Sequence, residues 1–241
     1  MVKIGWLADQ IGYIGGAEIS GSMLVNHAPD WAEIEFCPAN RRPPDDIDLW
    51  MLQNVVTYDA RWCEVLFGAP IIKHFRDPWH PGDPIFRRFV LDTAGLLIYN
   101  SKLARDRCPW YQGQPTAIVP PPVDLEVFRD AALPDEQRSG NLFVGRIDFA
   151  KGVHRAIDWA LGTGESLDIY GTGEFGWGRD LPQRIRFHGP QAYTRMPLLF
   201  GQAKRFVFLP GAYESYSRTT VEAWAAGCEL ILDQDKIGAI E

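Results

Sequence analysis

Residues 141–173 read NLFVGRIDFAKGVHRAIDWALGTGESLDIYGTG, and this stretch decides the fold. The apolar run at 141–146 predicts a buried strand, 151–161 predicts a helix, and 166–171 predicts a second strand. A strand, a helix and a strand in this order form a βαβ unit with two parallel strands. The stretch therefore predicts part of a doubly wound α/β sheet.

The same alternation extends on both sides of this stretch. Further strands are predicted at 2–8, 34–39, 47–55, 70–75, 95–101, 184–189, 204–210 and 228–233. Further helices are predicted at 16–28, 83–94, 101–108, 191–203 and 217–227. Residues 116–140 interrupt the pattern with a proline cluster and a polar tail, as a linker or domain edge does. We therefore expect two Rossmann-like, doubly wound parallel-sheet domains, 1–128 and 129–241, facing each other across a ligand cleft.

The composition is that of an ordinary globular protein. The chain has 241 residues, of which 46% are hydrophobic and 23% are charged. The net charge of −7 argues against bulk nucleic-acid binding, because neutralising phosphates requires a basic surface. Four scattered cysteines, no signal-peptide pattern and no long apolar run lead us to expect a cytoplasmic protein.

Gly171, Gly173 and Gly176 form a G-x-G-x-x-G pattern directly after a predicted strand. A dinucleotide site also needs a helix that begins within the pattern and an acidic residue about 20 positions later. Residues 181–213 contain no Asp or Glu, so NAD(P) binding is disfavoured. The glycines predict either a strand end that a ligand approaches closely or a tight turn that serves only the fold.

Arg146 and Lys151 predict an anion site. Arg146 lies at the end of a predicted strand, and Lys151 begins the next predicted helix. The free N–H groups and dipole of a helix N-terminus favour a phosphate there. The alternative is a pair of solvated surface cations.

Glu214 and Glu222 are separated by seven residues, with Glu222 inside a predicted helix that starts near Ser217. That helix is apolar nearly all round, so we expect it to be buried. A buried carboxylate needs hydrogen-bond donors, which either ribose hydroxyls or protein groups such as an arginine can supply. Ser215 and Ser217 can cap the helix, whose free N–H groups can also hold phosphate.

Over residues 141–232 the chain resembles the retaining, family-4-type glycosyltransferases of the GT-B fold. The motifs that carry the resemblance are FVGRIDFAKG, LDIYGTG, RFHG and ESYSRTTVEAWAAG, in the family's order and spacing. GGAE at 15–18 and VPPPVDLEVF at 119–128 extend it into the first half. The chain departs from the family pattern at Ser217, where glycine is usual, and at Glu229, where proline is usual. It also stops soon after its last predicted strand, which leads us to question closure of the cleft.

The resemblance implies roles for four catalytic residues. Arg146 and Lys151 hold the diphosphate of a nucleotide-sugar, and Glu214 contacts the sugar hydroxyls. His74 matches a histidine that often contacts the sugar, with a structural role in the core as the alternative.

The resemblance also implies a donor-binding set. Glu222 bonds the ribose hydroxyls, and the loop at Gly189 and Gln191 faces the base. The remaining positions are backbone or helix-cap contacts to the donor, namely Gly15, Gly16, Gly171, Gly173, Ser215, Tyr216, Ser217 and Arg218.

The implied function is transfer of a sugar from a nucleoside-diphosphate-sugar, such as a UDP- or GDP-sugar, to an acceptor hydroxyl with retention. No resident cofactor and no metal are expected, and no D-x-D acidic pair is present. The acceptor is a glycan, a lipid-linked sugar or a small molecule, and pairing into a homo-oligomer is a further expectation. The alternatives are a nucleotide-sugar-binding module without turnover, a glycosidase that uses Glu214 and Glu222, and an NAD(P) oxidoreductase.

Overall fold

The computed structural model describes residues 1–9, 16–53, 55, 58–75, 84–107, 113–173 and 180–240. The chain divides into two compact units, Met1–Pro122 and Val123–Ile240. The boundary predicted after residue 128 falls inside helix α5, which belongs to the second unit.

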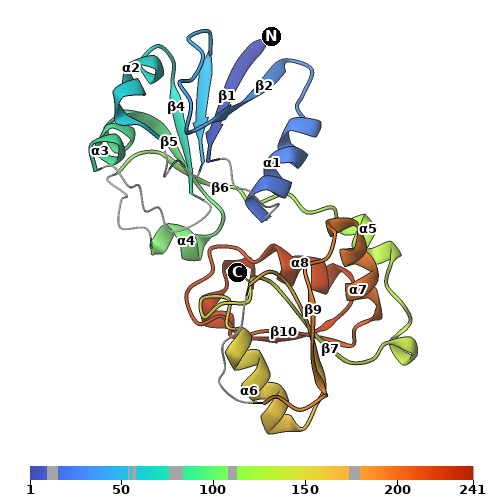
Figure 1. Cartoon of the computed structure of the whole chain (residues 1–241). Helices are drawn as coiled ribbons and strands as arrows, with labels where there is room; N and C mark the ends of the chain where they lie inside the picture. Colours follow the sequence, from blue (N-terminus) through green and yellow to red (C-terminus); the bar gives the residue numbers. More distant parts are fainter. Residues whose placement is uncertain are drawn as a thin grey trace. The chain divides into compact units, whose positions relative to one another are not determined.

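The first unit is built on a six-stranded parallel sheet in the order β2-β1-β3-β4-β5-β6. Its elements are β1 (Val2–Ala8), α1 (Gly16–Asn26), β2 (Ala32–Pro38), β3 (Leu49–Leu52), α2 (Cys63–Leu66), β4 (Ile71–Phe75), α3 (Pro84–Thr93), β5 (Ala94–Tyr99), α4 (Lys102–Asp106) and β6 (Thr116–Ile118). Figure 1 shows α1 on one side of this sheet, and α2 and α3 on the other. This is the two-sided covering of a doubly wound sheet, and it follows from right-handed crossovers in both directions from β1.

The core of the first unit lies on both faces of its sheet. Leu7, Leu52 and Leu97, one from each of three strands, are completely buried. Gly21 lets α1 approach β1 closely, because a Cβ there would lie 1.4 Å from the Trp6 ring. The first sheet is therefore buried on both faces, as parallel sheets normally are.

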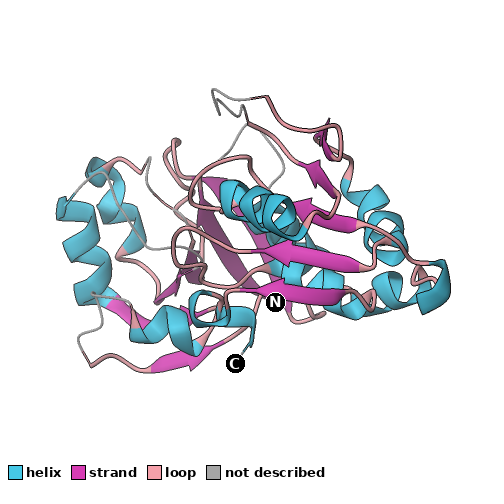
Figure 2. Cartoon of the chain, turned by 90° about the horizontal axis from the view of Figure 1, so that it is seen from below, coloured by secondary structure: helices cyan, strands magenta, loops and turns pink. Residues whose placement is uncertain are grey.

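The second unit is built on a five-stranded parallel sheet in the order β11-β10-β7-β8-β9. Its elements are α5 (Leu125–Asp130), β7 (Asn141–Val144), α6 (Val153–Thr163), β8 (Leu167–Tyr170), β9 (Ile185–Gly189), α7 (Met196–Gln202), β10 (Arg205–Phe208), α8 (Arg218–Ala225) and β11 (Glu229–Leu232). Helix α6 lies on one side of the sheet, and α5, α7 and α8 pack together on the other (Figure 1). Figure 2 colours the helices and strands of the chain by secondary structure.

The βαβ unit predicted from 141–173 is confirmed, since β7 and β8 pair in parallel across α6. The stretch 116–140, predicted to be a linker or domain edge, contains the boundary between the two units, but β6 and α5 also lie within it. The Asp124 carboxylate caps α5 by accepting a hydrogen bond from the Val127 amide at 3.4 Å, and Phe128 of that helix is buried in the second core. The prolines therefore lead into a helix cap instead of ending regular structure.

Helix α8, predicted to be buried, is buried on one face only. Ala223 and Ala225 are buried, but the Trp224 side chain on the opposite face is 57% exposed. Cys37, Cys63 and Cys228 are free thiols. Among the described residues, no helix is long and apolar enough to cross a membrane.

Candidate functional site

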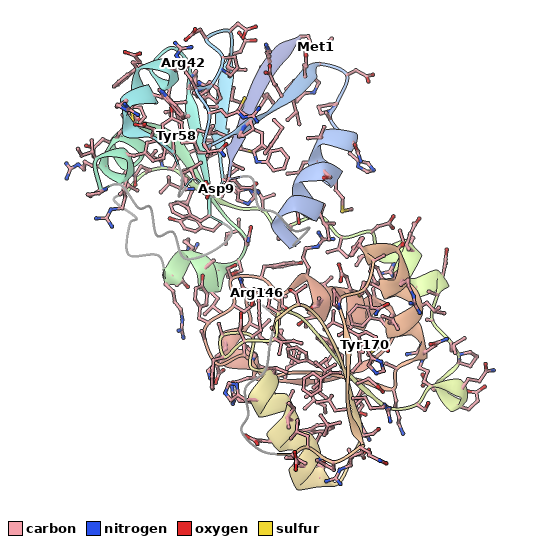
Figure 3. The ribbon with its side chains drawn as sticks, in the orientation of Figure 1. Met1, Asp9, Arg42, Tyr58, Arg146 and Tyr170 are labelled. Atoms are coloured by element: carbon pink, nitrogen blue, oxygen red, sulfur yellow. The ribbon has the colours of Figure 1, made fainter. Side chains whose placement is uncertain are left out.

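The predicted residues of the second half gather at one edge of the second sheet, where its parallel strands end. Arg146 follows β7, Gly171 follows β8, and Glu214 follows β10. Figure 3 labels Arg146 and Tyr170, which mark the ends of β7 and β8. The carboxyl edge of a parallel sheet is where ligands bind in doubly wound folds, so the position agrees with a binding site.

Gly171 and Gly173 allow two loops of this edge to touch through their backbones. The amide of Gly145 donates to the Tyr170 carbonyl at 3.0 Å, and the amide of Ile147 donates to the Thr172 carbonyl at 2.8 Å. A Cβ on Gly171 would lie 1.7 Å from the Gly145 carbonyl oxygen. A Cβ on Gly173, whose φ is +124°, would lie 2.8 Å from the Ile147 oxygen. The first two glycines of the pattern thus serve contact between loops, and Gly176 lies outside the described residues.

The loop that carries Arg146 and Lys151 is also held from the β10 side. Gly152 has φ +74°, and a Cβ there would lie 1.9 Å from the Leu209 carbonyl oxygen. The Gly211 amide donates to the Ala150 carbonyl at 3.1 Å. Backbone contacts on two sides therefore fix the backbone of the loop that carries Arg146 and Lys151.

Both cations have carboxylate neighbours. The Lys151 Nζ lies 2.5 Å from the Glu214 Oε2, and the Arg146 Nε lies 3.0 Å from the Asp148 Oδ2. Asp148 also accepts a hydrogen bond from the Lys151 amide at 2.7 Å. The structure thus brings Lys151 and Glu214 together from positions 63 residues apart in the sequence. Both cations are thus ion-paired at a partly exposed edge of the sheet, and the anion site stays a prediction.

Glu222 is held by protein groups inside the second unit. Its side chain is 3% exposed, and its Oε1 accepts a hydrogen bond from the Tyr193 hydroxyl at 2.9 Å. The Arg218 Nη2 lies 3.3 Å from the same oxygen. Burial raises the pKa of the Glu222 carboxyl, while Arg218 and Tyr193 act in the opposite direction. The arginine partner considered as an alternative is present, and the ribose contact stays a prediction.

The first turn of α8 is capped by Ser217. Its hydroxyl oxygen accepts from the Thr220 amide at 3.3 Å and lies 2.7 Å from the Thr220 hydroxyl. Ser215 and Ser217 are buried, and burial raises the pKa of the half-buried Tyr216 phenol. The loop before α8 is therefore packed into the unit, with Glu214 at its start.

The loop predicted to face the base follows β9. Gly189 has φ +69° with open space at its Cβ position. The Gln191 side chain donates to the His188 carbonyl at 3.3 Å and accepts from the Arg195 Nη1 at 2.9 Å. The His188 ring stacks on Tyr170, with centroids 4.5 Å apart. Sequence reasoning missed this aromatic pair, although Tyr170 lies in the LDIYGTG motif and His188 in the RFHG motif, because the contact depends on how β8 and β9 pair.

His74 belongs to the first unit, whereas the residues described above belong to the second. It is buried near the end of β4, and its Nε2 lies 3.0 Å from the Asn100 Oδ1. The adjacent Lys73 is buried as well, and its ammonium donates to the Gln53 carbonyl. Gly16 begins α1, and Gly15 lies outside the described residues. Within the described ranges, no group of three or more His, Cys, Asp or Glu residues could hold a metal ion.

No protein-family model matches the chain, and no curated protein sequence matches it either. Solved structures match over almost its whole length. HepE (Alr3699) of Anabaena, solved with UDP and glucose, is 19% identical with a TM-score of 0.75, covering 99% of this chain and 82% of its own. Sucrose-phosphate synthase of Thermosynechococcus elongatus is 14% identical with a TM-score of 0.72, covering 96% and 81%. A glycosyltransferase of Rickettsia africae is 11% identical with a TM-score of 0.69, covering 99% and 80%. Together with the two parallel sheets, these similarities show that the chain has the GT-B fold.

Proposed function

We propose that the protein is a glycosyltransferase that moves a sugar from a nucleoside-diphosphate-sugar to an acceptor hydroxyl with retention of configuration. One observation carries the proposal. At the carboxyl edge of the second sheet, Lys151 pairs with Glu214, and Arg146 on the same loop as Lys151 pairs with Asp148, in a fold shared with a protein solved with UDP and glucose.

In this proposal the second unit binds the donor. Arg146 and Lys151 neutralise its diphosphate, Glu214 contacts the sugar hydroxyls, and Glu222 contacts the ribose. The backbone of residues 215–218 and the loop at 189–191 complete the donor contacts, and a buried His74 takes part through the first unit.

The chemical difficulty is the charge that develops on the departing diphosphate. Fixed cations near that charge lower the barrier, because they need no reorganisation during the reaction. The bond between the anomeric carbon and the diphosphate oxygen breaks, and the acceptor oxygen bonds to the same face of that carbon. The acceptor proton passes to the departing diphosphate, so no enzyme nucleophile is required.

The ion pair between Lys151 and Glu214 is compatible with donor binding if the Lys151 ammonium exchanges the carboxylate for the diphosphate. A diphosphate with two acceptor oxygens can compete for the ammonium, which releases Glu214 for the sugar hydroxyls. The same ion pair also favours the second candidate, a nucleotide-sugar-binding module without turnover, if the pair persists when the donor binds.

Calorimetry with UDP-, GDP- and ADP-sugars, paired with an assay for nucleoside diphosphate release, separates these candidates. The proposal expects that at least one donor binds and that its nucleoside diphosphate is released as the sugar passes to an acceptor or, more slowly, to water. Tight binding with no release across an acceptor panel of glycans, lipid-linked sugars and small alcohols would favour the binding module. No binding of any donor would reject both.

A further inference from the structure

Tyr193, Arg218 and Glu222 form a closed triangle of polar contacts within the second unit. The Arg218 Nη2 donates to the Tyr193 hydroxyl oxygen at 2.8 Å, and that hydroxyl donates to the Glu222 Oε1 at 2.9 Å. The third side is the ion pair of 3.3 Å between Arg218 and the same carboxylate oxygen. Arg218 lies one helical turn before Glu222 on α8, whereas Tyr193 comes from the segment between β9 and α7.

The tyrosine ring is itself fixed in place. The Arg218 guanidinium lies over it, 5.4 Å from its centroid, and the buried Phe128 meets it edge-on with centroids 6.3 Å apart. The hydroxyl therefore has little freedom to turn away from the carboxylate. A group held this way orients its partner without a further entropy cost on ligand binding.

The two contacts to Glu222 fall on one oxygen. Among the described residues, both polar neighbours of the carboxylate meet Oε1, so Oε2 is the oxygen left for another donor. A buried carboxylate is stable as an anion only when donors surround it. Burial raises the pKa of this carboxyl, and the arginine and the tyrosine oppose that shift.

We propose that Tyr193 and Arg218 are positioning residues that fix the Glu222 carboxylate and direct its Oε2 to the ribose hydroxyls of the donor. This inference rests on the proposed function, and it adds two side chains to the site. Without the tyrosine hydroxyl, the carboxylate loses one of its two stabilising neighbours and becomes free to rotate. A neutral or rotated carboxyl makes a weaker bond to a ribose hydroxyl than a fixed anion does.

The test measures ribose discrimination, which is the Kd of a 2′-deoxy or 3′-deoxy nucleoside diphosphate divided by the Kd of the parent nucleotide. Calorimetry on the full chain uses whichever of UDP, GDP and ADP binds most tightly. We expect the unmodified protein to discriminate by about tenfold or more for at least one hydroxyl. Tyr193→Phe raises the Kd of the parent nucleotide about tenfold but leaves the Kd of the deoxy form nearly unchanged, so the ratio of the two Kd values falls toward one. Glu222→Gln gives the same pattern.

Tyr58→Phe is the matched control, because it removes a tyrosine hydroxyl that donates to the Trp62 carbonyl at 2.8 Å in the first unit. It lowers stability without changing the ratio. Arg218→Lys replaces Tyr193→Phe if the latter fails to fold, since one ammonium cannot reproduce both contacts of the guanidinium. If the Tyr193→Phe variant keeps the ratio of the unmodified protein, whether both Kd values rise in parallel or neither changes, this inference alone is overturned. Absence of nucleotide binding by the unmodified protein overturns the proposed function with it.

Discussion

At the scale of single residues, glycine determines the geometry of the candidate site. Gly152 adopts a left-handed conformation and touches the chain that leaves β10, while Gly171 touches the chain that leaves β7. The pattern of glycines around 171 therefore has a physical explanation that involves no ligand. A resemblance based on glycine spacing detects the close packing of loops, which nucleotide-binding folds require, and the charged side chains indicate the ligand.

We predict that Gly152→Ala destabilises the fold much more than Gly164→Ala. Both glycines have φ +74°, so the conformational penalty of about 1–2 kcal/mol is common to the two variants. Only at residue 152 would the new methyl group meet backbone, 1.9 Å from the Leu209 carbonyl oxygen, whereas residue 164 has open space. Urea denaturation measures the free energy of unfolding of each variant, provided that the m-values of the two variants agree. Equal losses in the two variants would mean that the loops can separate without cost.

A second prediction concerns the charge on Lys151. Lys151→Met should weaken nucleoside diphosphate binding by about 1–3 kcal/mol, because a charged hydrogen bond to phosphate is lost. Lys3→Met is the matched control, since Lys3 lies near the start of β1 in the first unit and pairs with Glu35 at 2.9 Å. It should leave nucleotide affinity unchanged. If calorimetry gives the same affinity for Lys151→Met as for the unmodified chain, the anion site lies elsewhere.

At the scale of secondary-structure elements, the periodicity of the sequence was sufficient for most helices and strands of the second unit. The run at 141–146 alternates with a helical pattern and a further apolar run, and β7, α6 and β8 form there as predicted. Helix α5 was missed because the prolines before it suggested a break, although prolines that precede the N-cap do not prevent a helix from beginning after it. The pairing of Lys151 with Glu214 and of Tyr193 with Glu222 was not predictable, because both join distant elements whose register depends on the whole sheet.

The β8–β9 pair offers a prediction about pH. The Asp168 carboxylate, 22% exposed, meets Arg186 of β9 at 2.7 and 2.5 Å and His188 at 2.6 Å. Burial alone would raise its pKa, but these two neighbours outweigh burial and lower it. A carboxyl with a lowered folded-state pKa stabilises the fold above its unfolded-state pKa, and this contribution disappears as pH falls through the folded-state value.

We therefore expect Asp168→Asn to cost about 1 kcal/mol of unfolding free energy at neutral pH, with the difference from the unmodified protein shrinking below about pH 4. Asp45→Asn removes the exposed pair with Arg42 and serves as the control, with little expected change. Chemical denaturation from pH 3 to pH 7 measures both variants. A difference for Asp168→Asn that is constant over this range would show that the carboxylate contributes through packing instead of charge.

At the scale of the whole molecule, the chain consists of two units with separate hydrophobic cores. The second core extends from Phe128 to Ile237 and contains only residues of the second unit. The residues proposed to hold the diphosphate, the ribose and the base also belong to that unit, whereas His74 belongs to the first. Donor binding and sugar transfer should therefore be separable by cutting the chain between the units.

The last prediction follows from this separation. A fragment of residues 123–240 should fold on its own, because it retains a complete five-stranded sheet with helices on both faces. It should bind the same nucleoside diphosphate as the full chain, with an affinity within about tenfold, and should release no diphosphate from a nucleotide-sugar. Lys151→Met in the fragment is the control, and it should weaken binding as it does in the full chain. A folded fragment with native-like circular dichroism but no nucleotide affinity would require the first unit to supply essential donor contacts, which would move the diphosphate site away from Arg146 and Lys151.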